Sequence, residues 1–192
     1  MIRHLFLTIF LTFSLVGVIN SQDHHDNHET HATHETGHGK HKISFFSGFT
    51  HVQAAFYEHE THEESTGKWI PTIGLDYYYS LSHRWEAGLI LDLELDEYYI
   101  NTSSHNELRR NNVFIAAAVA KYKPTKRIGL FAGPGYETEF QEGHTKSFFV
   151  LKTGIEYEVH IENGWEITPL FSYDFKEEYS AYSVGITLGK RF

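Results

Sequence analysis

Apolar side chains occur at every second position over long stretches of this chain. In the clearest stretch, 85–96, one face carries Trp85, Ala87, Leu89, Leu91, Leu93 and Leu95. A period of two is that of a β-strand, because successive side chains of a strand point to opposite faces, whereas a helix repeats every 3.6 residues. The preceding stretch, 69–81, alternates in the same way, and a turn at Ser82 and His83 lies between the two. The pair therefore predicts a hairpin with a tight turn.

The same alternation predicts eight strands after the N-terminal part of the chain. Their ranges are 43–58, 69–81, 85–96, 111–122, 127–140, 147–160, 165–175 and 180–192. Roughly 9–11 residues of a tilted strand cross the apolar layer of a membrane, so each strand is long enough to span it. The connections at 82–83, 123–126 and 161–164 are tight, while those at 59–66, 100–110, 141–146 and 176–179 are longer or more polar. Short periplasmic turns that alternate with longer outer loops, and an even strand number, are typical of bacterial outer-membrane barrels.

The first residues have the pattern of a secretory signal peptide. A short start containing Arg3 precedes an apolar run from Leu5 to about Ile19, and we expect cleavage after Ser21, so that residues 1–21 are removed. The alternative is an N-terminal membrane anchor, which needs roughly 20 apolar residues, more than this run supplies. After it, no apolar run is long enough for a transmembrane helix, so a membrane location of the mature chain requires a β-barrel. The sequence contains no Cys, which excludes a lipidated cysteine and disulfide bonds.

The composition favours strands and argues against nucleic acid as a partner. Aromatic residues make up 16% of the chain, and they are enriched in strands. The formal net charge is -9 at pH 7 with His neutral, and no Lys/Arg cluster interrupts this acidic character. A basic surface of the kind that binds nucleic acid is therefore not expected.

Alternation fits a soluble periplasmic β-barrel or sandwich as well as a membrane barrel, but three features favour lipid. Aromatic residues gather near the strand ends, as they do at two water–lipid boundaries. Those near the turns are Tyr79, Trp85, Tyr122, Trp165 and Phe192, and those near the loops are Trp69, Tyr98, Phe140, Phe175 and Tyr179. The face opposite the apolar one mixes Gly, Ser and Thr with acidic residues, as the lumen of a narrow barrel does. The last alternating strand stops at a Phe.

This last strand carries a family resemblance. Its residues Tyr182, Val184, Ile186, Leu188 and Phe192 resemble the C-terminal strand signal of Gram-negative outer-membrane proteins. The whole of 43–192 is similar in pattern to the small eight-stranded outer-membrane β-barrels. The resemblance implies an all-β, eight-stranded, antiparallel, up-and-down transmembrane barrel in the cell outer membrane. It also implies outer-membrane lipid and the barrel-assembly machinery as partners.

Four residues depart from that pattern. Lys190 stands where an apolar or aromatic residue is usual, and we expect it to reach the periplasmic boundary with its amine. Pro71, Pro134 and Pro169 fall inside predicted strands, although a closed barrel has no free edge that could accommodate a missing N–H donor. Since Pro134 lies between two glycines, a bulge or a bend is expected there.

Residues 22–42 form a low-complexity segment rich in His, Asp, Glu, Thr and Gly, with no apolar residue larger than Ala. Such a segment cannot build a core, so we expect a disordered periplasmic tail. Imidazole suits Zn, Cu and Ni, and neighbouring carboxylates can complete a coordination shell. The candidate metal ligands are His24, His25, His28, His31, His34, His38 and His41. The tail is predicted to gather around a divalent transition metal such as Zn, and the alternative is a solvated tether without a specific role.

The predicted lumen is rich in acidic residues. They are Asp76, Glu86, Asp92, Glu94, Asp96, Glu137, Glu139, Glu156, Glu158, Glu166 and Asp174, with Lys152, Lys176 and Arg84 as the nearest basic candidates. Because the side chains of an eight-stranded barrel just fill its interior, a packed polar plug is expected. The alternative is a narrow cation pathway, which the excess of acids over bases would favour.

Signals for catalysis are weak. A serine hydrolase needs a base beside its nucleophile, and the nearest sequence pair is Ser104 and His105, although adjacent residues rarely face one another. We therefore predict a non-enzymatic outer-membrane barrel that requires no cofactor and whose His-rich tail binds or buffers divalent metal. The alternatives are a purely structural or adhesion-type barrel and a narrow, porin-like cation-conducting pore.

Overall fold

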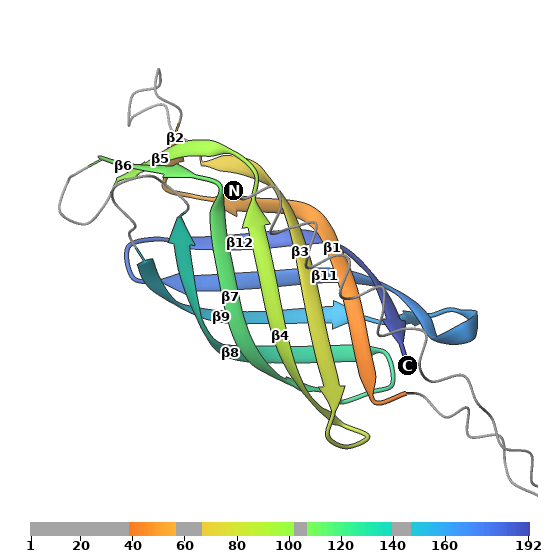
Figure 1. The fold of residues 1–192 in the computed structure, drawn as a ribbon. Coiled ribbons are helices and arrows are strands. Elements are labelled where there is room, and N and C mark those ends of the chain that lie inside the picture. The colour runs from red at the N-terminus through yellow and green to blue at the C-terminus, as the bar shows by residue number, and fades with distance from the viewer. Residues whose placement is uncertain (1–38, 57–66, 102–106, 140–146) are drawn as a thin grey trace, which may run out of the picture. The chain divides into compact units, whose positions relative to one another are not determined.

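Eight long strands form a closed antiparallel β-barrel (Figure 1). The computed structural model describes residues 39–56, 67–101, 107–139 and 147–192. The barrel strands are β1 (His41–Val52), β3 (Lys68–Ser80), β4 (Trp85–Glu94), β7 (Val113–Tyr122), β8 (Ile128–Glu139), β9 (Ser147–Tyr157), β11 (Trp165–Lys176) and β12 (Ser180–Arg191). Each pairs with its neighbour in sequence, and β1 pairs with β12, with Lys42 opposite Arg191, which closes the sheet. The predicted eight-stranded up-and-down barrel is confirmed.

The two ends of the barrel differ in their connections. The turn end carries the tight connections 81–84, 123–127 and 158–164, the start of β1 and the end of β12. The connection 158–164 contains the short β10 (Val159–His160), which continues the β9 ladder on β11, and the 3-10 turn η1 (Glu162–Gly164). The loop end carries the other connections. There β2 (Ala55–Phe56), β5 (Glu97–Asn101) and β6 (Glu107–Asn111) form a second, three-stranded sheet.

Two predicted boundaries need correction. The first strand begins at His41, two residues inside the segment 22–42 that we expected to be a disordered tail, and it ends at Val52. Most of the connection predicted at 100–110 belongs to the β5–β6 hairpin, which extends β4 and β7 past the barrel. The pairing shifts by one residue between the two hairpins, at Asp96 and Asn112, and Asn112 has a positive φ of 50°. A β-bulge at this point accounts for the shift, since Asn tolerates the left-handed conformation.

Each of the three prolines lies where one hydrogen-bonded ladder is interrupted or ends. The β7–β8 pairing lapses opposite Pro134 and resumes with the same register, so the chain contains a gap in the ladder and no inserted residue. The pairing of β9 with β11 is interrupted at Pro169 of β11. This interruption separates β9 from β10, which both pair with β11. Pro71 lies one residue beyond the last β3–β4 pair, although its carbonyl still accepts a bond from Leu95 N. The missing N–H donors therefore fall at points where no partner is engaged.

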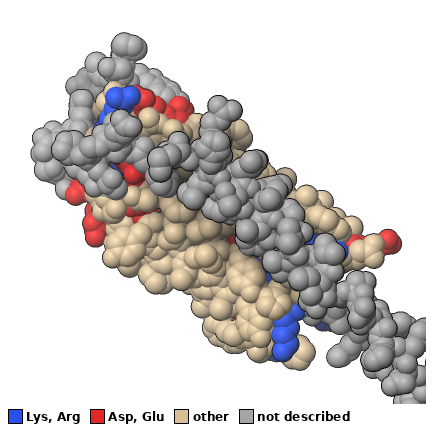
Figure 2. Space-filling view, in the orientation of Figure 1, with Lys and Arg blue, Asp and Glu red and all other residues tan. Residues whose placement is uncertain are grey.

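The outer wall of the barrel is apolar. Outward side chains such as Phe45, Leu89 and Ile186 are 51%, 43% and 54% exposed, and similar large residues occupy outward positions of the other barrel strands except β7, which carries alanines at 116, 118 and 120 there. Figure 2 shows a wall largely free of Lys, Arg, Asp and Glu, which gather toward the two ends of the barrel. A soluble monomer rarely exposes an apolar patch of more than a few hundred Å². A closed barrel whose apolar face points outward is suited to lipid.

The aromatic residues at the strand ends follow the prediction in part. Trp69, Trp85, Trp165 and Phe175 are between 43% and 50% exposed and lie on the outer wall. Tyr98 and Tyr179, predicted to belong to the outer girdle, are buried inside the loop end. Tyr98 stands at the inward parity of β5, and Tyr179, one residue before β12, continues the inward parity of Ala181 and Ser183. Parity decides the direction of a side chain more strongly than nearness to a strand end. Phe140 lies outside the described residues.

Lys190 behaves as expected at the turn end. Its amine donates to the backbone carbonyl of Asn163 and lies 5.4 Å from the centroid of the Trp165 ring. The aliphatic stem thus stays on the outer wall while the charge reaches the turn. Among the described residues, no helix is both long and apolar enough to cross a membrane.

Candidate functional site in the barrel interior

The interior is filled by charged side chains that alternate with the apolar outer ones. Of the residues that the structure describes, ten carboxylates and six Lys or Arg side chains are buried there. The acids are Asp76, Glu86, Asp92, Glu94, Glu137, Glu139, Glu156, Glu158, Glu166 and Asp174, and the bases are Lys42, Arg110, Lys121, Lys152, Lys176 and Arg191. They form three groups along the barrel, which we call the turn-end cluster, the middle layer and the loop-end cluster.

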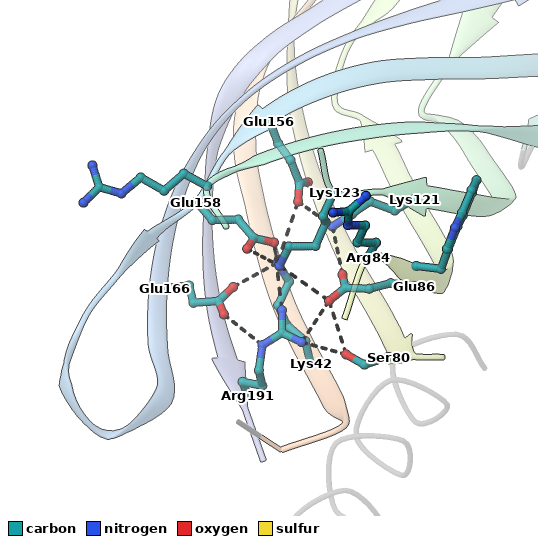
Figure 3. Close-up of polar contacts among 12 residues, drawn as sticks. Lys42, Ser80, Arg84, Glu86, Lys121, Lys123, Glu156, Glu158, Glu166 and Arg191 are labelled. Carbon is teal, nitrogen blue, oxygen red and sulfur yellow. Dashed lines mark hydrogen bonds and ion pairs between the residues drawn. The ribbon is translucent and has the colours of Figure 1, made fainter. Parts of the chain in front are cut away.

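The turn-end cluster is a network of ion pairs (Figure 3). Its members are Lys42, Glu86, Lys121, Lys123, Glu156, Glu158, Glu166 and Arg191. Lys42 Nζ lies 3.0 Å from Glu166 Oε2 and 3.3 Å from Glu158 Oε1. Arg191 donates from Nη1 to Glu86 and from Nε to Glu166, both at 2.9 Å. Four carboxylates face four cations, so the cluster is balanced.

Lys121 connects the turn-end cluster to the aromatic ring of Tyr78. Its Nζ lies 2.5 Å from Glu156 Oε1 and 3.4 Å from the centroid of the Tyr78 ring. Tyr78 is 2% exposed and lies over Gly88, where a Cβ would collide with the ring. Gly88 thus makes room for the aromatic floor of the turn-end cluster, and that floor separates the cluster from the middle layer.

The middle layer consists of Asp76, Asp92, Asp174 and Lys152. Lys152 Nζ lies 3.1 Å from Asp92 Oδ2 and 2.8 Å from Asp174 Oδ1. Beside them is a cavity of about 10 Å³, lined by Asp76, Asp92, Lys152, Ser172 and Ser183 together with apolar side chains. Such a volume is about that of one water-sized occupant. The interior is therefore packed at this level and contains no wide channel.

The loop-end cluster holds Glu94, Glu137, Glu139, Arg110 and Lys176. Lys176 Nζ lies 2.5 Å from Glu137 Oε2 and 3.4 Å from Glu94 Oε1. Arg110 pairs with Glu137, and its Nη1 lies 2.5 Å from Glu139 Oε1. The hydroxyls of two buried tyrosines donate to this cluster, that of Tyr98 to Glu94 at 2.5 Å and that of Tyr179 to Glu137 at 2.7 Å.

An apolar cap closes the loop end beyond these charges. It contains Val52, Ala55, Ile70, Ile100, Val113, Ile115 and Ala181, with the rings of Tyr98 and Tyr179. Because β2 and β5 belong to the second sheet, this sheet contributes side chains to the cap over the barrel interior. The charged interior thus lies beneath an apolar layer at the loop end.

The predicted metal ligands are mostly outside the described part of the chain. His24, His25, His28, His31, His34 and His38 lie outside the described residues, as do His59, His62, Ser104 and His105. His41 is described: its Nδ1 lies 2.8 Å from the Tyr77 hydroxyl, and its ring stacks on Phe192. His41 thus belongs to the outer wall at the turn end.

Another group of possible metal ligands, Glu158, His160 and Glu166, lies at the turn end. Their ligand atoms lie within 4.8 Å of one another, and His160 Nε2 is 3.6 Å from a carboxylate oxygen of each glutamate. Both glutamates already face Lys42 and Arg191. A metal ion would have to compete with these cations, so the charges present do not favour it.

Sequence reasoning identified the interior acids better than the interior bases. Lys152 and Lys176 are inside as predicted, but the side chain of Arg84 is exposed. Asp96 is only half-buried, and its Oδ1 accepts from Glu97 N within the bulge, so it is not a lumen residue. Four interior bases were missed: Lys42, Arg110, Lys121 and Arg191. The parity of β7 and β12 could have found Lys121 and Arg191, because both alternate with outward side chains.

No protein-family model matches the sequence, and no curated protein matches it either. Solved structures with a similar fold include Ail, the attachment invasion locus protein of Yersinia pestis, at 12% identity and a TM-score of 0.47, covering 81% of this chain and 99% of that one. The N-terminal β-barrel domain of Pseudomonas aeruginosa OprF has 11% identity and a TM-score of 0.47, with 81% and 99% covered. Outer membrane protein W of E. coli has 11% identity and a TM-score of 0.41, with 81% and 100% covered.

The side chains described above identify the kind of protein. In the described part of the chain each of the eight barrel strands pairs with a neighbour on both sides, and the outer wall is apolar while the charges lie inside. This arrangement is the one in which strands cross an outer membrane. The chain is a small eight-stranded β-barrel of the outer membrane.

Proposed function

We propose that this chain is a non-enzymatic outer-membrane barrel that does not conduct ions and that holds a metal-binding, His-rich segment at the periplasmic side. The observation that carries the proposal is the position of His41. It begins β1 at the turn end, where its N and O atoms bond to the backbone of Phe192 at 3.0 and 2.9 Å. The six candidate ligands from His24 to His38 precede this residue directly in the sequence.

Orientation follows from the connections. Short turns of outer-membrane barrels face the periplasm and longer loops face outward. With the tight turns at the same end as His41, the segment 22–40 would lie in the periplasm. Imidazoles there, with Asp23, Asp26, Glu29 and Glu35 among them, suit Zn²⁺ or a similar divalent transition metal.

The filled interior supports a non-conducting barrel. Ion pairs occupy the turn end and the middle, and the apolar cap lies over the loop end. A narrow cation pathway would have to cross all three. We therefore assign the function to the His-rich segment that the barrel anchors, and we assign no role in transport or catalysis to the barrel interior.

Metal binding is tested by titrating Zn²⁺ into the full chain refolded in detergent, by isothermal calorimetry. A variant with His24, His25, His28, His31, His34 and His38 replaced by Asn should lose most of the Zn²⁺ bound. A control variant with His59 and His62 replaced by Asn should bind as the unaltered chain does. Equal binding by all three would contradict the proposal and leave a purely structural or adhesion-type barrel as the function.

Conduction is tested separately in planar bilayers. The refolded chain should give no conductance steps. Cation-selective steps that disappear on substituting Asp92 and Glu94 by Asn and Gln would contradict a non-conducting barrel and support the pore instead.

A further inference from the structure

The negative charge of the interior is unevenly distributed. The turn-end cluster balances four acids with four bases, and the loop-end cluster holds three acids, Glu94, Glu137 and Glu139, against Arg110 and Lys176. The middle layer holds three aspartates against Lys152 alone. Among the described residues this layer thus has the largest excess of acids, and it lies between the other two clusters. A buried charge without a partner is strongly unfavourable.

The excess is centred on Asp76. Lys152 is engaged with Asp92 and Asp174, whereas no oxygen of Asp76 lies within ion-pair distance of a cation among the described residues. Asp76 is 5% exposed, and its Oδ1 has no hydrogen-bond partner in the described part of the chain. The residue lines the cavity of about 10 Å³.

The cavity is built to present oxygen atoms. Asp92 on β4 pairs with Gly74, two residues before Asp76 on β3, and its Oδ1 rests against Gly74, a position where a Cβ would collide with it. Ser172 and Ser183 line the same cavity and are 2% and 5% exposed. Lys152, paired with Asp92 and Asp174, also lines the cavity, and the remaining wall is formed by the apolar side chains Phe46, Ile90, Phe131 and Leu170 with the ring of Tyr78.

We propose that this cavity binds one small, hard cation, held by the carboxylates of Asp76 and Asp92 with the hydroxyls of Ser172 and Ser183 around it. Carboxylate and hydroxyl oxygens are ligands of Ca²⁺, Mg²⁺ and similar hard cations, and the set contains no imidazole that would favour Zn²⁺. The volume accommodates one ion-sized occupant. The cation offsets the excess charge of the middle layer and stabilises the closed barrel. This inference is independent of the His-rich segment.

The test measures the unfolding of the full chain in detergent by urea, followed by tryptophan fluorescence, in three chloride salts of equal ionic strength. The cations are Na⁺, Ca²⁺ and the bulky N-methylglucamine, which cannot enter the cavity. At a concentration about ten times Kd, the cation that binds should lower the unfolding equilibrium constant about tenfold relative to N-methylglucamine. Whether Na⁺ or Ca²⁺ does so identifies the charge of the occupant.

Two variants assign the effect to the cavity. Asp76→Asn should remove the dependence on the cation and should be at least as stable as the unaltered chain in N-methylglucamine. Ser183→Ala keeps the charge but removes one oxygen, so it should shift the dependence to higher concentration. Glu97→Gln, exposed on β5 and 12 residues from its partner Arg109, is the matched control and should keep the full dependence.

Two results would overturn the proposal. One is equal stability of the unaltered chain in all three salts. The other is an infrared difference spectrum in which Asp76→Asn removes a protonated carboxyl band that neither Na⁺ nor Ca²⁺ diminishes, because a proton would then neutralise Asp76 in place of a cation.

Discussion

A lysine placed on the outer wall at the middle of the membrane tests whether that wall faces lipid. Leu89 is outward on β4 and 43% exposed, four residues from Trp85 at the turn end. At about 3.4 Å per residue and a tilt of about 40°, this spacing puts Leu89 about 10 Å from Trp85 along the barrel axis. The apolar band of such barrels is about 25 Å tall, so Leu89 lies near its midplane.

The two environments predict very different costs for Leu89→Lys. In lipid, Lys at the midplane of a barrel costs about 2–4 kcal/mol, and near the interface about 0–1 kcal/mol. In water, the same change at a half-exposed site should stay within about 0.5 kcal/mol. Leu81→Lys is the matched control, because Leu81 is 63% exposed at the tight turn that follows β3.

The assay is reversible urea unfolding in lipid vesicles, with tryptophan fluorescence and heat-modifiable gel migration as two readouts. We expect Leu89→Lys to lower the free energy of unfolding by about 2–4 kcal/mol and Leu81→Lys by at most about 1 kcal/mol. Equal, small effects of both substitutions would refute a lipid-facing wall. Efficient folding of the unaltered chain in buffer without detergent would refute it too.

Three further predictions concern the interior, the loop-end hairpin and the β7–β8 ladder. Arg110→Met leaves two buried glutamates without this cation and should lower the free energy of unfolding by about 3–5 kcal/mol. The control Arg109→Met, on the exposed face, should change the free energy of unfolding little. Similar losses for the two variants in urea unfolding would contradict this prediction. The hydrogen bond from Arg109 holds the pKa of Glu97 below its ordinary value. The pair therefore stabilises the hairpin at neutral pH, and this stabilisation is lost as the pH falls through the lowered pKa. In Arg109→Gln, an NMR titration should show that the pKa of Glu97 returns to the ordinary range. Gly133→Ala would drive a Cβ into the backbone carbonyl of Ala118 opposite and should cost about 1–3 kcal/mol in the same assay, and an unchanged midpoint would show that the two strands can separate there.

The fold could be predicted from the sequence because alternation is a local property. Every outward residue of 85–96 was assigned correctly, from Trp85 to Leu95. A strand with one face in lipid cannot slip by one residue, because the slip would turn all its apolar side chains inward and all its polar side chains toward lipid. Alternation also held at Tyr98 and Tyr179, and the error there came from using nearness to the strand end instead. The signal peptide, the tail and its metal remain predictions.

The interior was less predictable, because partners across a barrel are far apart in sequence. Lys42 meets Glu158 and Glu166 after more than 110 residues, and no local pattern brings these charges together. The same holds for the cap, where residues of β2 and β5 meet Val113 and Ala181. Which acid finds a base, and which, like Asp76, does not, depends on the closed barrel as a whole.

The pairing of β1 with β12 has a consequence for biogenesis. Lys42 and Arg191 are paired although they lie about 150 residues apart in the sequence. One edge of β1 therefore stays unpaired until the last strand, β12, has folded against it. Until β12 is delivered, the edges of β1 and β11 remain open templates on which another copy of the chain could add a strand. A chain stalled just before this strand should therefore be prone to cross-pairing with its own copies, which gives the cell a reason to shield the nascent edges until closure.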